Sequence, residues 1–117
     1  MMEKEKFDLL YTHFPEDVQH DHRSLSRAAI HAGRRIPRIL GYRCTWYESE
    51  TPFAPDFFVD ISGMWETKEE AIRKYQSDSG FVREEKIRYF KNDAENNGCQ
   101  NGVDYAEGFR VIRWLER

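Results

Sequence analysis

Side chains that could bind a metal or carry a proton cluster in residues 13–23, which read His-Phe-Pro-Glu-Asp-Val-Gln-His-Asp-His-Arg. Three of the four histidines of the chain lie in this run, together with two aspartates and a glutamate. Zinc binds His nitrogens and carboxylate oxygens, and a catalytic zinc usually takes three protein ligands and keeps one position open. The run could supply one or two of these ligands, and His20 and His22 would share a face in a strand but splay in a helix.

The same residues have a simpler interpretation. Asp17 and Asp21 are typical of a turn and of a helix N-cap, and the histidines could be solvated side chains on a loop. His13 is more consistent with a structural role than with a metal ligand, and His31 with an exposed position on the next helix. The spacing alone leaves both interpretations open.

Hydrophobic patterning predicts the elements that position this run. Residues 7–12 form a short apolar run, typical of a strand buried on both faces. From Arg23 to about Gly33 the pattern changes to helical spacing, with Asp21 as a reasonable N-cap. The apolar stripe of that helix consists of Leu25, Ala28, Ala29 and Ala32. The histidine run is therefore predicted to lie in the loop between a strand and the helix that follows it.

The rest of the chain predicts three more strands and two more helices. The strands cover residues 38–46, 57–61 and 105–114, and the helices cover 64–76 and 80–95, the second ended by Asn96-Asn97-Gly98. Strands that alternate with helices are typical of an α/β fold with a mainly parallel sheet. In such sheets ligands bind at the carboxyl ends of the strands, which is where the histidine run is expected.

Composition restricts the classes of function. The 117 residues are 39% hydrophobic, 33% charged and 15% aromatic, which is typical of one globular domain. A net charge of −3 and a pI near 5.8 do not favour a nucleic-acid partner. No run approaches the roughly 18 apolar residues of a membrane helix, and the first residues do not resemble a signal peptide. We expect a cytoplasmic protein with no membrane partner, in which Cys44 and Cys99 are reduced thiols.

Four segments carry a resemblance to a known family. They are "DLLYTHFPEDVQHDHRSLSRAAIHAGRR", "PRILGY", "FAPDFFVDISGMWETKEEAIRKYQSD" and "VDYAEGFRVIR". In this order they resemble the second metal-site motif, the next strand, the Pro-x-x-Phe-Val-Asp-Ile segment with its helix, and the closing strand of the PIG-L/LmbE-like zinc-dependent N-acyl deacetylases. The resemblance covers nearly all of residues 7–113.

The resemblance implies a Rossmann-like α/β fold and hydrolysis of an N-acyl group, usually N-acetyl on an amino sugar or a related conjugate. It implies zinc as the cofactor, with His22 as a ligand and Asp21 as the carboxylate beside the active site. The family's protonated histidine, which stabilises the oxyanion, corresponds to Gln19 here. Gln19 can donate a hydrogen bond but cannot carry a proton, and His20 stands next to it.

The family's first motif, Ala-His-Pro-Asp-Asp-Glu, does not occur in these 117 residues. In the family it supplies two further zinc ligands and the aspartate base. The resemblance therefore implies that residues 1–117 are one domain, the C-terminal half of a deacetylase-like domain without its N-terminal strands, in a truncated, split or cut form. Zinc binding by this chain alone is then expected to be weak, with His22 as the expected ligand, and the question of enzymatic activity stays open.

The alternative from a different class is a non-catalytic binding or assembly module derived from the same fold. In both cases the strand at residues 7–12 would lack neighbours on one side, and exposed strand edges invite association. We therefore expect a partner along residues 5–14, which is either a complementing N-terminal half or a second copy of the chain.

Overall fold

The computed structural model describes residues 7–46, 51–78 and 80–116 of the chain. In chain order the elements are β1 (Leu9–His13), α2 (His20–Ala32), β2 (Arg38–Tyr42), β3 (Phe57–Asp60), α3 (Trp65–Asp78), α4 (Glu84–Asn101) and β4 (Ala106–Trp114). The fold is α/β, and it divides into two compact units, residues 1–57 with 109–117 and residues 58–108. The expectation of a single domain stays a prediction.

The strands form one sheet in the order β1-β2-β4-β3, and the sheet is mixed. β1 and β2 are parallel, whereas β2 and β4 are antiparallel with an irregularity between Ile39 and Leu40. The N–H of Asp56 donates to the carbonyl oxygen of Phe109, and the N–H of Ile61 donates to that of Tyr105. Residue numbers therefore rise along one segment as they fall along the other, which is the order of antiparallel segments. The mainly parallel sheet is therefore not confirmed, because in the described residues α2 alone connects two neighbouring parallel strands.

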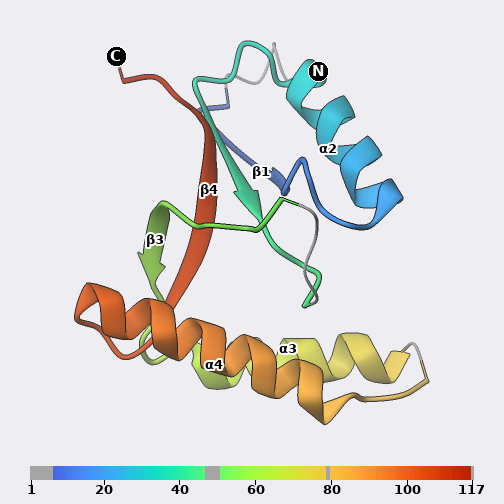
Figure 1. Ribbon diagram of the computed structural model, residues 1–117, viewed down its shortest axis with the longest axis vertical. Helices are drawn as coiled ribbons and strands as arrows, with labels where there is room; N and C mark the ends of the chain where they lie inside the picture. Colours follow the sequence, from blue (N-terminus) through green and yellow to red (C-terminus); the bar gives the residue numbers. More distant parts are fainter. Residues whose placement is uncertain (1–6, 47–50, 79, 117) are drawn as a thin grey trace. The chain divides into compact units, whose positions relative to one another are not determined.

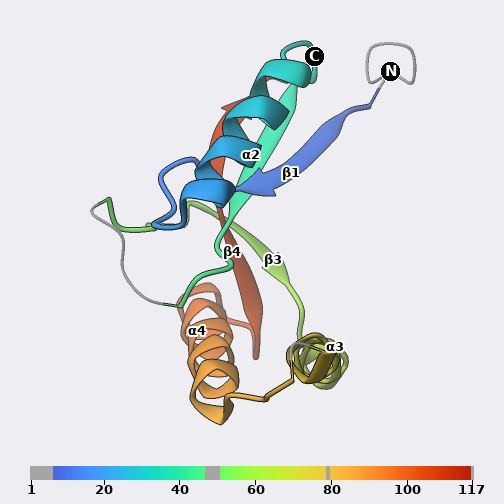
Figure 2. The same ribbon diagram turned by 90° about the vertical axis from the view of Figure 1, so that its right-hand side faces the viewer.

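Helix α2 covers the parallel pair in the first unit and packs on β1 (Figures 1 and 2). Beneath it, Ile39 and Leu40 of β2 are fully buried. The helix begins at His20, three residues before the predicted start, and its N-cap is Gln19 instead of Asp21. His20, Asp21 and His22 therefore belong to the first turn of a helix and not to a loop.

The face that α2 turns to the sheet differs from the predicted stripe. Ser26 is fully buried and its hydroxyl donates a hydrogen bond to the carbonyl oxygen of His13 at 2.7 Å. Leu25 is 56% exposed, because the helix presents the small, polar Ser26 to the strand instead of the larger apolar side chain. At the end of the helix, a Cβ on Gly33 would lie 2.9 Å from the Leu10 side chain, so glycine permits this close approach.

In the second unit, α3 packs against α4. The core of this unit contains Ile61, Trp65, Ile87 and Ala94. The predicted end of α4 at Asn96-Asn97-Gly98 is wrong, since the helix continues to Asn101 and ends at Gly102, whose φ is 74°. Gly98 serves packing instead, because a Cβ there would lie 2.7 Å from backbone atoms of Asp104. No helix in the described part of the chain is long and apolar enough to cross a membrane.

Candidate metal centre

Two parallel strands and one helix place three possible metal ligands together. His13 is the last residue of β1 and pairs with Tyr42, the last residue of β2. Cys44 follows two residues after the end of β2, and His22 lies in the first turn of α2. The arrowheads of β1 and β2 lie next to each other in Figure 1, so both strands deliver their carboxyl ends to the same place. This is the end of a parallel pair at which α/β proteins bind ligands.

His13, His22 and Cys44 each offer one ligand atom, and these three atoms lie within 4.8 Å of one another. The two imidazole rings are stacked with centroids 4.1 Å apart and 7° between their planes. The Nδ1 atoms of His13 and His22 are buried without a hydrogen-bond partner. Buried polar atoms are nearly always satisfied in proteins, so the Nδ1 of His13 indicates a missing partner, whereas the Nδ1 of His22 lies 3.4 Å from a carboxylate oxygen of Asp17.

A buried carboxylate lies behind His22. Asp17 is 3% exposed, and its Oδ1 lies 3.4 Å from Nδ1 of His22. Asp17 also accepts hydrogen bonds from the Thr45 hydroxyl at 2.6 Å and from the Gln19 N–H at 2.9 Å. Burial alone would raise the pKa of Asp17, but these hydrogen bonds and His22 together hold it below its ordinary value. Asp17 is therefore an anion that can orient the ring of His22.

Burial and the neighbouring His22 lower the pKa of His13. Taking an imidazolium out of water is costly, and a second imidazole beside it adds repulsion when both are charged. The neutral form of His13 is therefore favoured near neutral pH. Neutral imidazole is the form that binds a metal ion.

Of the residues that the sequence assigned to the site, His22 belongs to this cluster, whereas the expected catalytic residues Gln19, His20 and Asp21 are not members of it. The side chain of Asp21 is exposed, and its Oδ1 accepts a hydrogen bond from the backbone N–H of His22 at 3.1 Å. His20 is exposed, with Nε2 3.5 Å from the Ser24 hydroxyl. His20 and His22 splay apart, as expected for residues two apart on a helix. The roles of Gln19, His20 and Asp21 in catalysis stay predictions.

Three residues in or beside the cluster were missed or undervalued from the sequence, and the first is His13, which was interpreted as structural. Cys44 had no nearby cysteine or histidine along the chain, so no spacing motif pointed to it. Asp17 was interpreted as a turn residue, and its hydrogen bond from the Gln19 N–H is consistent with that role. Its bond from Thr45 and its contact with His22 depend on the pairing of β1 with β2, which local sequence patterns do not reveal.

The donor set fits zinc. Imidazole nitrogen and thiolate sulfur are common zinc ligands, and tetrahedral bond lengths place ligand atoms roughly 3.3–3.5 Å apart. Ligand atoms within 4.8 Å reach that spacing when the side chains turn, because the stacked rings of His13 and His22 do not aim their lone pairs at one point, and Cys44 is exposed beyond the strand. The partly exposed positions of His13 and His22 leave access to the cluster.

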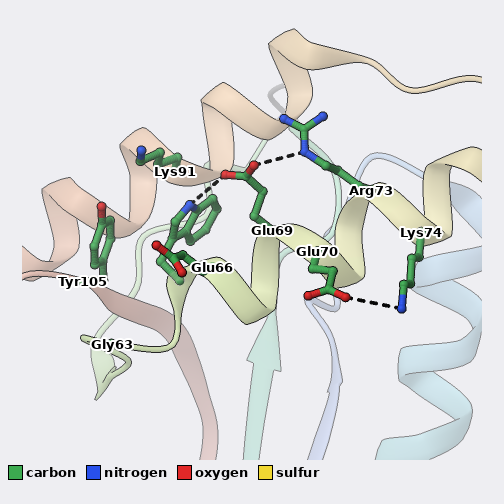
Figure 3. Close-up of a pocket in the computed structure, with 9 residues that line it drawn as sticks. Gly63, Glu66, Glu69, Glu70, Arg73, Lys74, Lys91 and Tyr105 are labelled. Carbon is green, nitrogen blue, oxygen red and sulfur yellow. Dashed lines mark hydrogen bonds and ion pairs between the residues drawn. The ribbon is translucent and has the colours of Figure 1, made fainter.

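A second candidate site lies in the other unit, where a pocket of about 680 Å³ is lined by residues of α3 and α4 and of the segments beside them (Figure 3). Two of its three acidic side chains, Glu69 and Glu70, are paired with neighbours. Glu69 accepts hydrogen bonds from Trp65 at 3.1 Å and from Arg73 at 3.0 Å, and Glu70 lies 3.4 Å from Lys74. The Arg73 hydrogen bond is the main cause that lowers the pKa of Glu69. The charged side chains of this pocket therefore form a surface ion-pair network. Arg73 of α3 also donates to Glu84 of α4, so the network links the two helices.

Comparison with protein-family models and with curated proteins finds no match. Among solved structures, the chain is similar to the conserved protein TT1542 from Thermus thermophilus, with a TM-score of 0.77 and 26% sequence identity. The similarity covers 99% of this chain and 56% of TT1542, so the chain spans little more than half the length of that protein. The similarity supports the α/β fold, and the resemblance to PIG-L/LmbE-like deacetylases stays a prediction.

Proposed function

We propose that the chain is part of a zinc-dependent hydrolase of the PIG-L/LmbE kind that removes an N-acyl group from an amino sugar or a related conjugate. The observation that carries this proposal is His22, backed at 3.4 Å by the buried Asp17 at the carboxyl ends of two parallel strands. A ligating histidine whose other nitrogen faces a carboxylate is the usual arrangement in metal sites. We place the protein in the cytoplasm, where thiols stay reduced.

Zinc at this position would supply a Lewis acid that polarises an amide carbonyl and acidifies water. The residues of the chain would do the remaining work of binding and orientation. Asp17 fixes the ring of His22, while Gln19 and His20 stand at the N-terminus of α2, where donors and the helix dipole favour a developing oxyanion. A pocket of about 380 Å³, lined in part by Phe14 and Glu16 of the β1–α2 connection, is large enough for a sugar, although none of His13, His22 and Cys44 lines it.

The general base of this reaction is not evident near His22 in the described residues. Asp17 already accepts hydrogen bonds from Thr45 and Gln19, and Asp21 is turned to the backbone of its own helix. A base must lie within hydrogen-bond reach of the water that it activates. The proposal therefore assigns the base to a second polypeptide that carries the family's His-Pro-Asp-Asp-Glu motif.

Strand β1 is the place at which that polypeptide would add. β1 stands at the end of the strand order, so one of its edges pairs with no strand in the described residues. Phe7 and Tyr11 on this segment are 51% and 48% exposed. Residues 5 and 6 of the predicted contact segment lie outside the described residues. Open strand edges with apolar side chains are sites of strand addition.

We expect the purified chain to associate at low micromolar concentration, because an open edge and exposed aromatic side chains are costly in a small protein. Light scattering after size-exclusion chromatography measures this directly. A monodisperse monomer with one cooperative unfolding transition would show that β1 needs no partner.

The proposed activity is tested by complementation. The zinc-loaded chain is assayed on N-acetylglucosamine conjugates, alone and with a separately produced polypeptide that carries the N-terminal half of a PIG-L/LmbE-like deacetylase. We expect no turnover by the chain alone, because it lacks the base, and acetate release in the mixture that His22→Ala abolishes. Metal-dependent turnover by the chain alone would refute the assignment of the base, and a mixture that associates without turnover would refute the hydrolase.

The second candidate function is a non-catalytic binding or assembly module. The observation that favours it is the open edge of β1, which needs no chemistry to recruit a partner. Gln19 in place of a proton-carrying histidine also favours it. The complementation experiment separates the two functions, because an assembly module forms the complex but releases no acetate.

A further inference from the structure

We propose that Cys44 is a metal ligand, and that with His13 and His22 it forms a zinc centre whose three protein ligands all come from this one chain. The ligand atoms of these residues converge within 4.8 Å although they come from three different segments. The sequence alone predicts a single ligand, His22, and weak binding. Weak binding was expected because one ligand is too few. A catalytic zinc usually takes three ligands from its protein, so three converging ligands favour tighter binding.

Each of the two imidazoles has a nitrogen that could bind a metal ion. The Nδ1 atom of His13 is buried and has no hydrogen-bond partner, so this nitrogen lacks a partner that an ion could supply. His22 has Asp17 on its Nδ1 side, which leaves Nε2 as the nitrogen that can face an ion. The two rings are stacked at 4.1 Å with 7° between their planes, so their in-plane lone pairs run side by side, and one ring must turn for both to bind the same ion.

Cys44 is positioned by the segment on either side of it. Tyr42, two residues earlier, pairs with His13 in the β1–β2 register and accepts a hydrogen bond at its carbonyl oxygen from the N–H of Phe14. Thr45, the next residue, is 3% exposed and donates to Asp17 at 2.6 Å. The same carboxylate therefore holds both His22 and the residue beside Cys44.

The thiol is also chemically suitable. Zinc binds thiolate, so the Cys44 S–H bond breaks on binding, its proton passes to solvent, and a sulfur–zinc bond forms with no change in oxidation state. Cys44 is exposed, so its proton can pass to solvent. Cys99 is also an exposed thiol, but it belongs to α4 in the other unit and provides a matched control.

This inference deepens the metal site of the proposed function but does not depend on hydrolysis. Cobalt(II) reports its ligands by absorption, and a thiolate ligand adds an intense sulfur-to-cobalt charge-transfer band in the near ultraviolet. We expect the full chain titrated with cobalt(II) to show this band at one equivalent. Cys44→Ser should lose the band and bind cobalt on the order of 100-fold more weakly, whereas Cys99→Ser should keep both the band and the affinity.

Thiol labelling gives a second readout on the same proteins. With zinc bound, a thiol reagent should modify Cys99 at its metal-free rate, while Cys44 should be protected. Circular dichroism tests whether each variant is folded. We expect Cys44→Ser to fold, because Cys44 is exposed. Bound cobalt without the charge-transfer band, a band that persists in Cys44→Ser, or a chain that binds no cobalt would overturn the inference. A Cys44-dependent band without acetate release in the complementation assay would reject the hydrolase and keep the centre.

Discussion

We expect the replacement of His22 with alanine to lower the zinc affinity of the chain by on the order of 100- to 1000-fold, since zinc sites gain several kcal/mol from each protein ligand. His22 offers one of the three converging ligand atoms and has the carboxylate of Asp17 behind it. Its loss leaves a thiol and one imidazole, which cannot hold the ion in competition with a mild chelator. Competition titration with a chromophoric chelator measures the change.

Two other histidines on α2 serve as controls for His22. His20 and His31 are both exposed, and they lie in the first and last turns of the same helix. We expect His20→Ala and His31→Ala to bind zinc as tightly as the unsubstituted chain. A loss of affinity in His20→Ala as large as in His22→Ala would contradict the geometry, because it would require the first turn of α2 to rotate.

The second large effect concerns Asp17. We expect Asp17→Asn to lower zinc affinity by about 10- to 100-fold, the range found when a carboxylate behind a ligating histidine is removed. The amide carries no charge to stabilise a ligating His22, and it no longer accepts from both Thr45 and Gln19 as the carboxylate does. Because Thr45 adjoins Cys44, the substitution also loosens the segment that carries the thiol.

Asp21→Asn is the matched control for Asp17→Asn. The resemblance to the PIG-L/LmbE-like family assigns the carboxylate beside the zinc ligand to Asp21, whereas the structure has Asp17 next to the ring of His22. We expect Asp21→Asn to change zinc affinity by less than about threefold, as for a surface substitution away from the ligands. A larger loss in Asp21→Asn than in Asp17→Asn would support the family assignment and reject the role of Asp17. Thermal unfolding of both variants, with and without zinc, separates a loss of metal binding from a loss of stability.

The sequence was sufficient to predict the elements on either side of the histidine run. The strand before the histidine run and the helix after it were predicted from patterning, and the helix ends at Gly33 as expected. His22 was identified as a candidate ligand because it matches the zinc-binding histidine of the motif that the chain resembles. Cys44 could not be predicted, because it reaches His22 only through the parallel register of β1 with β2, in which His13 pairs with Tyr42. A register between strands depends on tertiary packing that local residue spacing does not encode.

The errors in the fold have similar causes. The start of α2 was placed too late because Asp21 is a strong N-cap residue type, whereas the cap is Gln19 and the carboxylate of Asp17 binds the Gln19 N–H instead. The end of α4 was placed too early because Asn-Gly usually ends a helix, but Gly98 is there for its close contact with Asp104. The direction of β4 was missed because two helices precede it, so it returns antiparallel to β2.

X-ray absorption at the zinc edge of the loaded chain tests the central claim most directly, because it reports the ligand elements and their distances without reference to activity. The account predicts one sulfur ligand at about 2.3 Å together with nitrogen or oxygen ligands at about 2.0 Å, and loss of the sulfur shell in Cys44→Ser but not in Cys99→Ser. A zinc ion surrounded by nitrogen and oxygen alone in the unsubstituted chain would contradict it.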